Sequence, residues 1–388
     1  MKFLRVLHAF KVFPPDVNGG IPEVIASLAK AMAPRHQSSV LVARTRGWGR
    51  RYVIDGIPVE ALGSFGTILS SPISPGFPLV LAKRSQQVEL VAFHHPSPLN
   101  DLATIGLPIR TALVVHWHSE IIGRRPLADV VAPLIRRTLA RAQSIIVSHP
   151  SILRNSPFLA VHREKCAVVP YGVDVPFWGE TCDSMRRKVE ELRSRHPRLV
   201  IATGRLVPYK GFNVLIEALR HVDATAIIVG DGRLREALSR AAVRLGLGHK
   251  IILAGPLSRD DLKIHLHAAR LFVLPSVSAA ETFGIAQVEA MAAGLPIVNT
   301  DLPTAFPDVA RHGLEALTVP PNDPTALAAA ISLLMDDKEM SLRLGSAGRA
   351  RAKAEYKLET FSARIEQVYE SAIKCLLACP EHGHRQAS

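Results

Sequence analysis

The chain has 388 residues, a hydrophobic content of 48% and a formal net charge of +13 at pH 7. This length favours two domains over a single core, and the composition excludes a disordered or low-complexity protein. No apolar run reaches about 18 residues, so we expect no transmembrane helix, and the first residues lack the apolar core of a signal peptide.

The positive charge is concentrated in the first half of the chain. Residues 1–178 contain 20 lysines and arginines against 10 aspartates and glutamates, a net charge of +10, whereas residues 179–388 contain 27 against 24, a net charge of +3. We therefore expect an anionic partner for the first half. A membrane surface or a phosphorylated substrate ranks above nucleic acid, because no zinc-finger, RNA-recognition or helix-turn-helix signature is present.

The four cysteines, at positions 166, 182, 375 and 379, have neither zinc-site nor disulfide-framework spacing, which predicts reduced thiols in the cytoplasm.

The first predicted elements form a βαβ unit. An apolar strand over 4–9 leads into a loop that ends at Gly19 and Gly20, a helix follows with Pro22 near its first position, and a second strand covers 39–43. Glycines let the backbone approach a ligand closely, and the N-terminus of the next helix suits a diphosphate. The GxGxxG fingerprint of a dinucleotide-binding domain is missing, so the two glycines are equally consistent with a tight turn.

Two segments of the first half are candidates for contact with a membrane or with an apolar acceptor. Residues 64–82 are rich in Ser, Pro, Gly and Phe, and predict either an exposed mobile loop or a loop that packs on its own domain. Residues 124–141 show a basic amphipathic pattern, which suits an anionic bilayer. The same pattern is more often a domain helix with a solvated basic face.

Two predicted strands, within 90–95 and 111–120, run into histidines. Ligands of open α/β sheets bind beyond the carboxyl ends of the strands. A single histidine is more often structural, but this position makes His118 our first choice for the chemistry.

A charged helical stretch over 176–197 contains no strand, and we place the domain boundary between residues 176 and 177. A second alternation of strands and helices follows, which predicts a second doubly wound parallel sheet. Its strands are expected within 199–205, 225–232, 251–255, 271–275, 296–300 and 316–319, and one long helix is expected at 356–377. Two such domains in series leave a cleft between them, which is a favoured position for a ligand.

The stretch from Glu281 to Glu289 is the clearest candidate site. We expect a helix over 283–293 with Thr282 as its N-cap and Gly294 as its end. The N–H groups of residues 283–285 would then be free, and two acids beside such donors would form a cradle for a sugar attached to a phosphate. An ordinary amphipathic helix with surface acids is the alternative.

Arg205 and Lys210 share a loop after the strand 199–203. Two cations near a helix N-terminus can bind a diphosphate and stabilise the charge that develops on it as it leaves. No Asp-x-Asp pair occurs in the chain, so no metal bridge for the diphosphate is evident and the two cations would replace it.

These motifs form an ordered set. Gly-Arg-Leu-Val-Pro-Tyr-Lys-Gly at 204–211, Gly-Asp-Gly at 230–232 and Glu-x7-Glu at 281–289 follow Gly19-Gly20, His118 and the segment 171–174. The set resembles retaining glycosyltransferases of the GT-B type, in the large family 4. The resemblance implies an α/β fold of two doubly wound, Rossmann-like domains that face each other across a cleft. The acceptor-binding domain would cover 1–176 and the nucleotide-sugar-binding domain 177–355, and a helix over 356–377 would cross back to the first domain.

The resemblance also implies the roles of the site residues. The residues that act on the transferred sugar and its leaving diphosphate would be His118, Glu281, Arg205 and Lys210. Glu289 would bind the ribose hydroxyls, and Glu281 the sugar hydroxyls. The remaining contacts to the nucleotide sugar would come from Gly19, Gly20, Gly230, Asp231, Phe283 and Gly284. No metal or other cofactor is implied.

Retention needs no separate base if a donor phosphate oxygen takes the acceptor proton on the same face of the sugar. A covalent mechanism with Glu281 as nucleophile is an alternative on chemical grounds. The segment 114–120, together with the acidic stretch, looks most like mannosyltransferases that build exopolysaccharide units on a polyprenyl-diphosphate lipid. This resemblance implies GDP-mannose as the donor, a lipid-linked or saccharide acceptor, and a cytoplasmic protein that is peripheral on the inner face of the cell membrane.

Three other interpretations remain. The first is a transferase of the same fold that moves glucose or N-acetylhexosamine from a UDP-sugar. The second is a nucleotide-sugar epimerase or a phosphorylase on the same scaffold. The third is a non-catalytic basic protein that binds nucleic acid or a membrane, which predicts salt-sensitive binding of polyanions without turnover.

Overall fold

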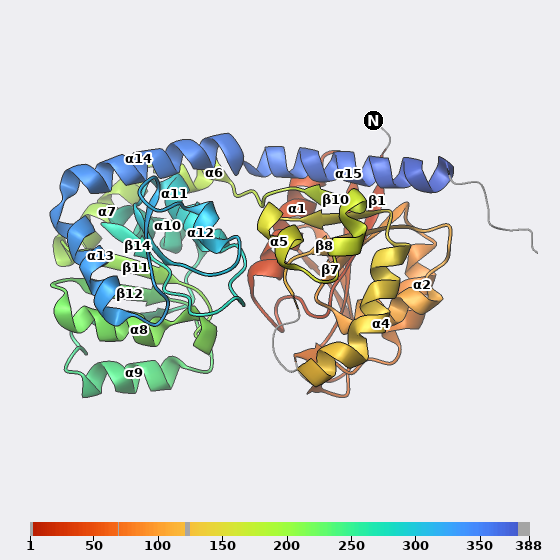
Figure 1. The fold of residues 1–388 in the computed structure, drawn as a ribbon, viewed down its shortest axis with the longest axis horizontal. Coiled ribbons are helices and arrows are strands. Elements are labelled where there is room, and N and C mark those ends of the chain that lie inside the picture. The colour runs from red at the N-terminus through yellow and green to blue at the C-terminus, as the bar shows by residue number, and fades with distance from the viewer. Residues whose placement is uncertain (1–2, 69, 121–124, 379–388) are drawn as a thin grey trace, which may run out of the picture. The chain divides into compact units, whose positions relative to one another are not determined.

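The computed structural model describes residues 3–68, 70–120 and 125–378 (Figure 1). It forms two compact units, of which the first contains Met1–Tyr171 with Leu358–Ser388 and the second contains Gly172–Lys357. The sequence predicted that the chain passes from the first domain to the second after residue 176, but it does so after Tyr171. The reason is the helix α6 (Val175–Gly179), which packs against α11 (Ile285–Ala293) of the second unit.

The first unit is built on an eight-stranded sheet in the order β10-β9-β8-β7-β1-β2-β4-β3. All neighbouring pairs are parallel except β3 and β4, an antiparallel edge hairpin that the sequence analysis did not predict. Successive strands are added on one side of β1 and then on the other, so the switch point of the sheet lies between β1 and β7. The strands are β1 (Arg5–Ala9), β2 (Gln37–Ala43), β3 (Arg50–Ile54), β4 (Ile57–Leu62), β7 (Leu90–His95), β8 (Ala112–Trp117), β9 (Ser144–Val147) and β10 (Cys166–Val168).

Helices cover both faces of this sheet, and a small ribbon of two strands lies outside it. The core on one face includes Phe77, Trp117 and Ile135, and the core on the other includes Phe13 and Ile25. The helices of this unit are α1 (Gly20–Met32), α2 (Phe77–Ser85), α3 (Pro98–Ala103), α4 (Arg125–Arg141), α5 (Pro150–Asn155) and α15 (Leu358–Ala378). The ribbon consists of β5 (Thr67–Ile68) and β6 (Ser71–Pro72).

The structure revises two expectations for this unit. Residues 64–82 are not one open loop, because α2 begins at Phe77, and the side chains of Phe77 and Leu81 are fully buried. The C-terminal helix begins at Leu358 rather than at residue 356, and it contacts α1 and β8 (Figure 1). Of the basic segment 124–141, residue 124 lies outside the described part of the chain.

The second unit is a six-stranded sheet in the order β13-β12-β11-β14-β15-β16, and every neighbouring pair is parallel. Its switch point lies between β11 and β14. The strands are β11 (Leu199–Thr203), β12 (Thr225–Val229), β13 (Ile251–Gly255), β14 (Leu271–Val273), β15 (Ile297–Thr300) and β16 (Ala316–Val319). Besides α6 and α11, the helices are α7 (Asp183–Arg195), α8 (Phe212–Ala218), α9 (Arg235–Arg244), α10 (Arg259–Ala268), α12 (Phe306–Val309), α13 (Pro324–Asp336) and α14 (Lys338–Glu355).

The strands of the second unit are almost continuous apolar runs because helices bury both faces of the sheet. Val200, Leu215 and Ile331 are fully buried in its main core. Among the described residues, no helix is long and apolar enough to cross a membrane. Cys166, Cys182 and Cys375 are free thiols, and Cys379 lies outside the described residues.

Candidate active site

In the second unit, two loops of the predicted site meet at the switch point of the sheet. The loop after β11 carries Lys210, and the loop after the neighbouring strand β14 carries Glu281. The Lys210 Nζ atom lies 2.6 Å from the Glu281 Oε2 atom. Lys210 is 9% exposed and Glu281 7% exposed, so this is a nearly buried ion pair.

Neighbouring hydroxyl groups hold both the carboxylate and the backbone of Glu281 in place. Ser276 donates a hydrogen bond from Oγ to Glu281 Oε2 at 2.9 Å, and Thr304 donates from Oγ1 to the backbone oxygen of Glu281 at 2.8 Å. The hydrogen bond and the cation on the same carboxylate oxygen fix the direction of this side chain. The Lys210 ammonium has three donors, so the ion pair does not use all of its capacity for a phosphate oxygen.

Arg205 is exposed, and its described hydrogen bond is a long one, 3.5 Å from Nη2 to the hydroxyl of Tyr209. The two cations of this loop therefore differ in environment. Lys210 is fixed against Glu281, whereas Arg205 faces solvent and is available to an anion.

The helix near Glu281 begins later than predicted. It covers Ile285–Ala293, and its N-cap is Gly284 in the left-handed region (φ 71°), not Thr282. The predicted end at Gly294, also left-handed, is correct. Among the described residues, the N–H groups of Ile285 and Ala286 have no backbone acceptor, whereas the N–H of Gln287 already donates to the Gly284 oxygen.

This shift changes the position of Glu289. It is the fifth residue of α11, about one turn from the helix start rather than two. Its side chain is partly exposed, on the same stripe of the helix as Ile285. The predicted contact with ribose is compatible with this position, and it stays a prediction.

Packing against the loop after β11 explains why a glycine stands in the turn after β12. A Cβ atom on Gly230 (φ 131°) would lie 2.1 Å from the backbone oxygen of Gly204, so the two loops touch through their backbones. The N–H of Leu206 also donates to the Asp231 oxygen at 2.9 Å. The structure thus explains Gly230 by loop packing, and the base-pocket role of Gly230 and Asp231 stays a prediction.

In the first unit, Gly19 and Gly20 stand at the start of α1, beyond the carboxyl end of β1. Pro22 has no N–H and the N–H of Glu23 donates to the Gly19 oxygen, which leaves the N–H groups of Gly20 and Ile21 for an anion. A Cβ atom on Gly20 would meet no atom of the described residues within 4 Å. Internal packing therefore does not explain this glycine, and close approach of a ligand would.

His118 follows β8 and is 3% exposed. Its Nε2 atom lies 2.8 Å from Nδ1 of His94, and its Nδ1 atom lies 2.5 Å from the hydroxyl of Tyr171. Burial lowers the pKa of His118 to about 3, so the imidazole is neutral at pH 7. Both ring nitrogens are therefore in use inside the protein, which the sequence analysis did not foresee.

Sequence reasoning also missed that His8 belongs to this cluster. His8 is fully buried in β1, and its Nδ1 atom lies 3.0 Å from Nε2 of His94. The available signal was the presence of histidines in three strands, β1, β7 and β8, or directly after them. These strands are neighbours in the sheet, but their adjacency is a property of the topology.

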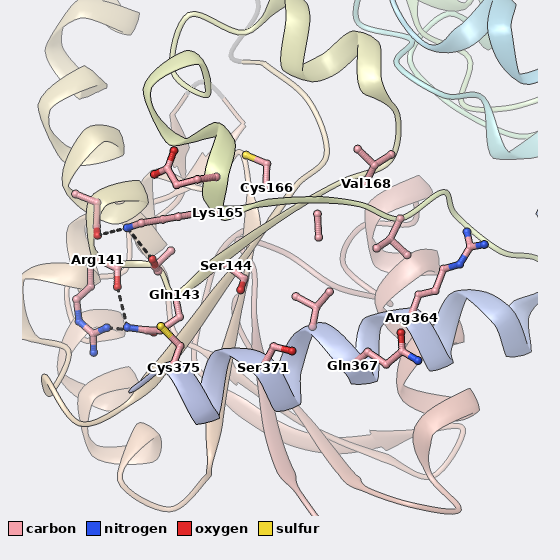
Figure 2. A pocket seen from close by; sticks show the side chains of 16 residues that line it. Arg141, Gln143, Ser144, Lys165, Cys166, Val168, Arg364, Gln367, Ser371 and Cys375 are labelled. Atoms are coloured by element: carbon pink, nitrogen blue, oxygen red, sulfur yellow. Dashed lines mark hydrogen bonds between the residues drawn. The ribbon is translucent and has the colours of Figure 1, made fainter. Parts of the chain in front are cut away.

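A groove of about 790 Å³ lies in the first unit between α15 and the strands β9 and β10, of which β10 is at the edge of the sheet (Figure 2). Its two basic side chains beside β9 and β10 are turned to backbone carbonyls: Arg141 to those of Pro108, Ile109 and Thr111, and Lys165 to those of Ala140 and Ala142. The groove lies at the amino end of β9, whereas the predicted site residues follow the carboxyl ends of strands. It is not part of the candidate active site.

Comparisons with known proteins agree with this picture. Residues 185–351 match the family described as "Glycosyl transferases group 1", and residues 19–172 match the family described as "Glycosyl transferase 4-like domain". The chain is 28% identical over 353 residues to D-rhamnosyltransferase WbpZ of Pseudomonas aeruginosa, which covers 90% of this chain and 91% of that protein. It is also 28% identical over 357 residues to O-antigen chain mannosyltransferase C of Escherichia coli, with coverage of 90% and 93%.

Among solved structures, Anabaena Alr3699/HepE in complex with UDP and glucose superposes with a TM-score of 0.76 at 21% identity. The match covers 95% of this chain and all of that one. At this identity the likeness shows the shared fold.

Proposed function

This chain belongs to the GT-B glycosyltransferases, with a glycosyl transferase 4-like domain in its N-terminal half and a glycosyl transferases group 1 domain in its C-terminal half. We propose that it transfers a hexose from a nucleotide sugar to a lipid-linked or saccharide acceptor with retention of configuration. The predicted family and the predicted fold class of two doubly wound α/β domains are both confirmed. The observation that supports the donor side best is the Lys210–Glu281 pair at the switch point of the second sheet.

The charges of this site suit a leaving diphosphate. Lys210 and Arg205 would stabilise the negative charge that develops on the diphosphate as the bond from the sugar C1 to the phosphate oxygen breaks. On the same face the acceptor oxygen forms its bond to C1, and its proton passes to a donor phosphate oxygen. The proposal needs neither a side-chain base nor a metal ion.

Glu281 would hold hydroxyl groups of the donor sugar. Its carboxylate is fixed by Lys210 and Ser276 through the same oxygen, Oε2. A cation and a hydrogen-bond donor on a carboxylate lower its nucleophilicity, so this geometry favours an orienting role over attack on the sugar. The covalent mechanism would have to use the other carboxylate oxygen, Oε1.

The donor we propose is GDP-mannose, and the acceptor is a growing cell-surface polysaccharide on a lipid carrier. The name of the Escherichia coli relative, O-antigen chain mannosyltransferase C, supports mannose as the transferred sugar and a cell-surface polysaccharide as the acceptor. A UDP-sugar donor is the alternative, because the superposed Anabaena protein is a complex with UDP and glucose.

A thermal-shift panel tests the donor side directly. GDP, UDP and ADP, each alone and as its hexose conjugate, are added to the purified chain. A melting temperature that rises with GDP and GDP-mannose, and less with the others, is the expected result, because ligands that bind the folded state raise it. A rise with UDP-sugars alone would transfer the proposal to the alternative donor, and no rise with any nucleotide would reject it.

We also propose that the first unit meets the anionic inner face of the cell membrane. Trp48 is 91% exposed and Phe65 81% exposed. They lie on adjoining segments, because Gly47 and Ser64 form an antiparallel bridge with two backbone hydrogen bonds. Aromatic side chains are enriched at membrane interfaces, and the exposed Arg46 nearby adds attraction to anionic lipids.

A further inference from the structure

Four buried histidines lie together in the first unit, and three of them form a chain of hydrogen bonds. The Nδ1 atom of His8 lies 3.0 Å from Nε2 of His94, and Nδ1 of His94 lies 2.8 Å from Nε2 of His118. The chain ends at Tyr171, whose hydroxyl lies 2.5 Å from Nδ1 of His118. The fourth, His116, lies beside His94 with ring centroids 4.6 Å apart.

The position of this chain in the fold relates it to the site. His8 is in β1 and His94 is in β7, so their hydrogen bond crosses the switch point of the first sheet. Tyr171 is the last residue before the polypeptide leaves this unit. The histidine that the family resemblance assigns to the donor sugar is therefore tied to the switch point on one side and to the unit boundary on the other.

The donor-to-acceptor direction of these hydrogen bonds follows from one buried atom that has no hydrogen-bond partner among the described residues. A neutral imidazole has one N–H and one lone pair, so all three hydrogen bonds must run the same way. The Nε2 atom of His8 has no hydrogen-bond partner among the described residues. If the chain ran from Tyr171 to His8, that atom would be a buried N–H without an acceptor, which is rare and costly.

If the hydrogen bonds run from His8 to Tyr171, the Nε2 atom of His8 keeps only an unsatisfied lone pair. The Tyr171 hydroxyl then accepts from His118, and Ser148 is a further partner for its own proton. His8, His94 and His118 then all carry their proton on Nδ1. Each imidazole is neutral at pH 7, because burial lowers the pKa of His8 to about 4 and that of His118 to about 3, and lowers that of His94 well below its ordinary 6.5. Burial also raises the pKa of Tyr171, so its phenol stays protonated.

We propose that His8 and His94 are positioning residues that hold His118 in the Nδ1–H tautomer, with its ring fixed between His94 and Tyr171. The proposal rests on the proposed function, since His118 matters for turnover only if sugar transfer occurs. His94 donates to Nε2 of His118, and His8 donates to Nε2 of His94. A donor sugar that needs a ring nitrogen of His118 must displace either His94 or Tyr171.

His116 supports the same arrangement from the side. Its Nε2 atom lies 2.7 Å from the hydroxyl of Tyr369, which comes from α15 and is fully buried. The ring of His116 is held next to that of His94, with an angle of 23° between their planes. α15 therefore contributes one side chain to the support of His94.

A metal site is the other use of such a cluster, since ligand atoms of His94, His116 and His118 lie within 4.8 Å of one another. The facing nitrogens of His94 and His118 are only 2.8 Å apart. Two imidazoles on one tetrahedral zinc ion, each about 2.0 Å from it, hold their nitrogens roughly 3.3 Å apart. The observed spacing is that of a hydrogen bond.

The first test determines the tautomer of His118 in the unaltered protein. The full chain labelled with ¹⁵N in its histidines is examined by NMR between pH 6 and pH 8, with and without one equivalent of zinc. The expected spectrum shows His118 with a protonated Nδ1 and an unprotonated Nε2 throughout this range. A protonated Nε2 on His118, or stoichiometric metal in the purified protein that is lost in His94→Leu, would overturn the proposal. This readout does not depend on sugar transfer. It therefore separates failure of the proposed hydrogen-bond chain from failure of the proposed function.

The second test uses paired variants. His94→Leu removes the donor to His118, whereas His94→Asn can keep an N–H near the position of Nδ1. We expect His94→Leu to lower kcat about tenfold with KM changed less than about twofold, and His94→Asn to restore kcat to within about threefold. Exposed His249 of the second unit, changed to Leu, is the matched control and should leave kcat unchanged. If folded His94→Leu turned over like the parent, His94 would have only a structural role.

Discussion

Lys210 and Glu281 are 71 positions apart in the sequence, yet the Nζ atom of one lies 2.6 Å from Oε2 of the other. They meet because β11 and β14 are neighbours, on the two sides of the point at which the strand order reverses. The pair therefore depends on the topology of the sheet as much as on the two motifs that supply it.

Removal of one partner should expose how much the second unit depends on this pair. Lys210→Ala leaves the Glu281 carboxylate nearly buried without its cation, which we expect to lower the free energy of unfolding by about 3 kcal/mol. Sugar transfer should fall at least about 100-fold, because the leaving diphosphate also loses a cation. Urea unfolding and initial-rate kinetics measure the two effects. Arg205→Ala is the matched control: it should change stability by less than about 0.5 kcal/mol and still slow transfer. Equal stability of both variants would contradict the role of the ion pair.

Two glycine substitutions should have opposite consequences. Gly284→Ala forces a side chain at φ 71°, with its Cβ 2.7 Å from the ring of Phe306, so we expect a loss of about 1–3 kcal/mol in unfolding free energy. Gly20→Ala meets no atom in the part of the chain that the structure describes, so it should leave stability within about 0.5 kcal/mol, yet weaken nucleoside diphosphate binding about tenfold. Calorimetric titration and thermal unfolding separate these outcomes. Unchanged binding by Gly20→Ala would remove that glycine from the donor site.

The buried histidines predict loss of stability in mild acid. Burial holds the pKa of His118 and His95 near 3 and that of His8 near 4, so the unfolded chain takes up protons below pH 6.5 that the folded protein does not. Each such histidine lowers the unfolding free energy by up to about 1.4 kcal/mol per pH unit as the pH falls from 6.5 toward 4. Asp101 acts in the opposite direction between about pH 7 and 4, because burial raises its pKa to about 7.

The histidines outnumber that one aspartate, so the net effect is destabilising. Melting temperatures at pH 7.5, 6.5, 5.5 and 4.5 check the sign. We expect little change between the first two and a progressive fall below them. A melting temperature that stays constant to pH 4.5 would mean that these histidines are not buried in neutral form.

The exposed aromatic side chains of the first unit predict binding to anionic vesicles. The chain should float with vesicles of phosphatidylglycerol and phosphatidylcholine, and less with phosphatidylcholine alone. The double variant Trp48→Ser with Phe65→Ser should lose most of this binding, whereas Leu342→Ser, at a 60% exposed position in α14 of the second unit, should not. Equal flotation of both variants would place the membrane contact elsewhere.

Much of the fold was predictable because it depends on local pattern. The apolar runs that predicted the strands of the second sheet are buried on both faces, and runs of that kind are typical of parallel strands. The hairpin of β3 and β4 was missed, although Asp55-Gly56 between two β-rich runs is a hairpin signal. Both residues have positive φ values, 49° and 80°. The start of α11 was misplaced because Thr282 is a good N-cap residue, whereas the structure uses Gly284.

The sequence predicted which residues form the candidate site, but not which of their side chains contact one another. The loops of Arg205, Lys210 and Glu281 could be placed at strand ends from the sequence, but the pairing of Lys210 with Glu281 required the strand order. The same holds for His8, which is an ordinary strand residue until β1 is placed beside β7. Contacts between elements distant in sequence are the part that local patterns do not contain.

The central claim is sugar transfer from a nucleotide donor by the second unit's Lys210–Glu281 site. The most direct measurement incubates the chain with GDP-mannose and a lipid-linked saccharide acceptor, with and without EDTA, and follows the product by NMR. We predict an α-linked product that forms equally with EDTA, and losses of at least about 100-fold in Glu281→Ala and Lys210→Ala. No product from GDP-, UDP- or ADP-hexoses, or product formation unaffected by these two substitutions and by His118→Ala, would contradict the account.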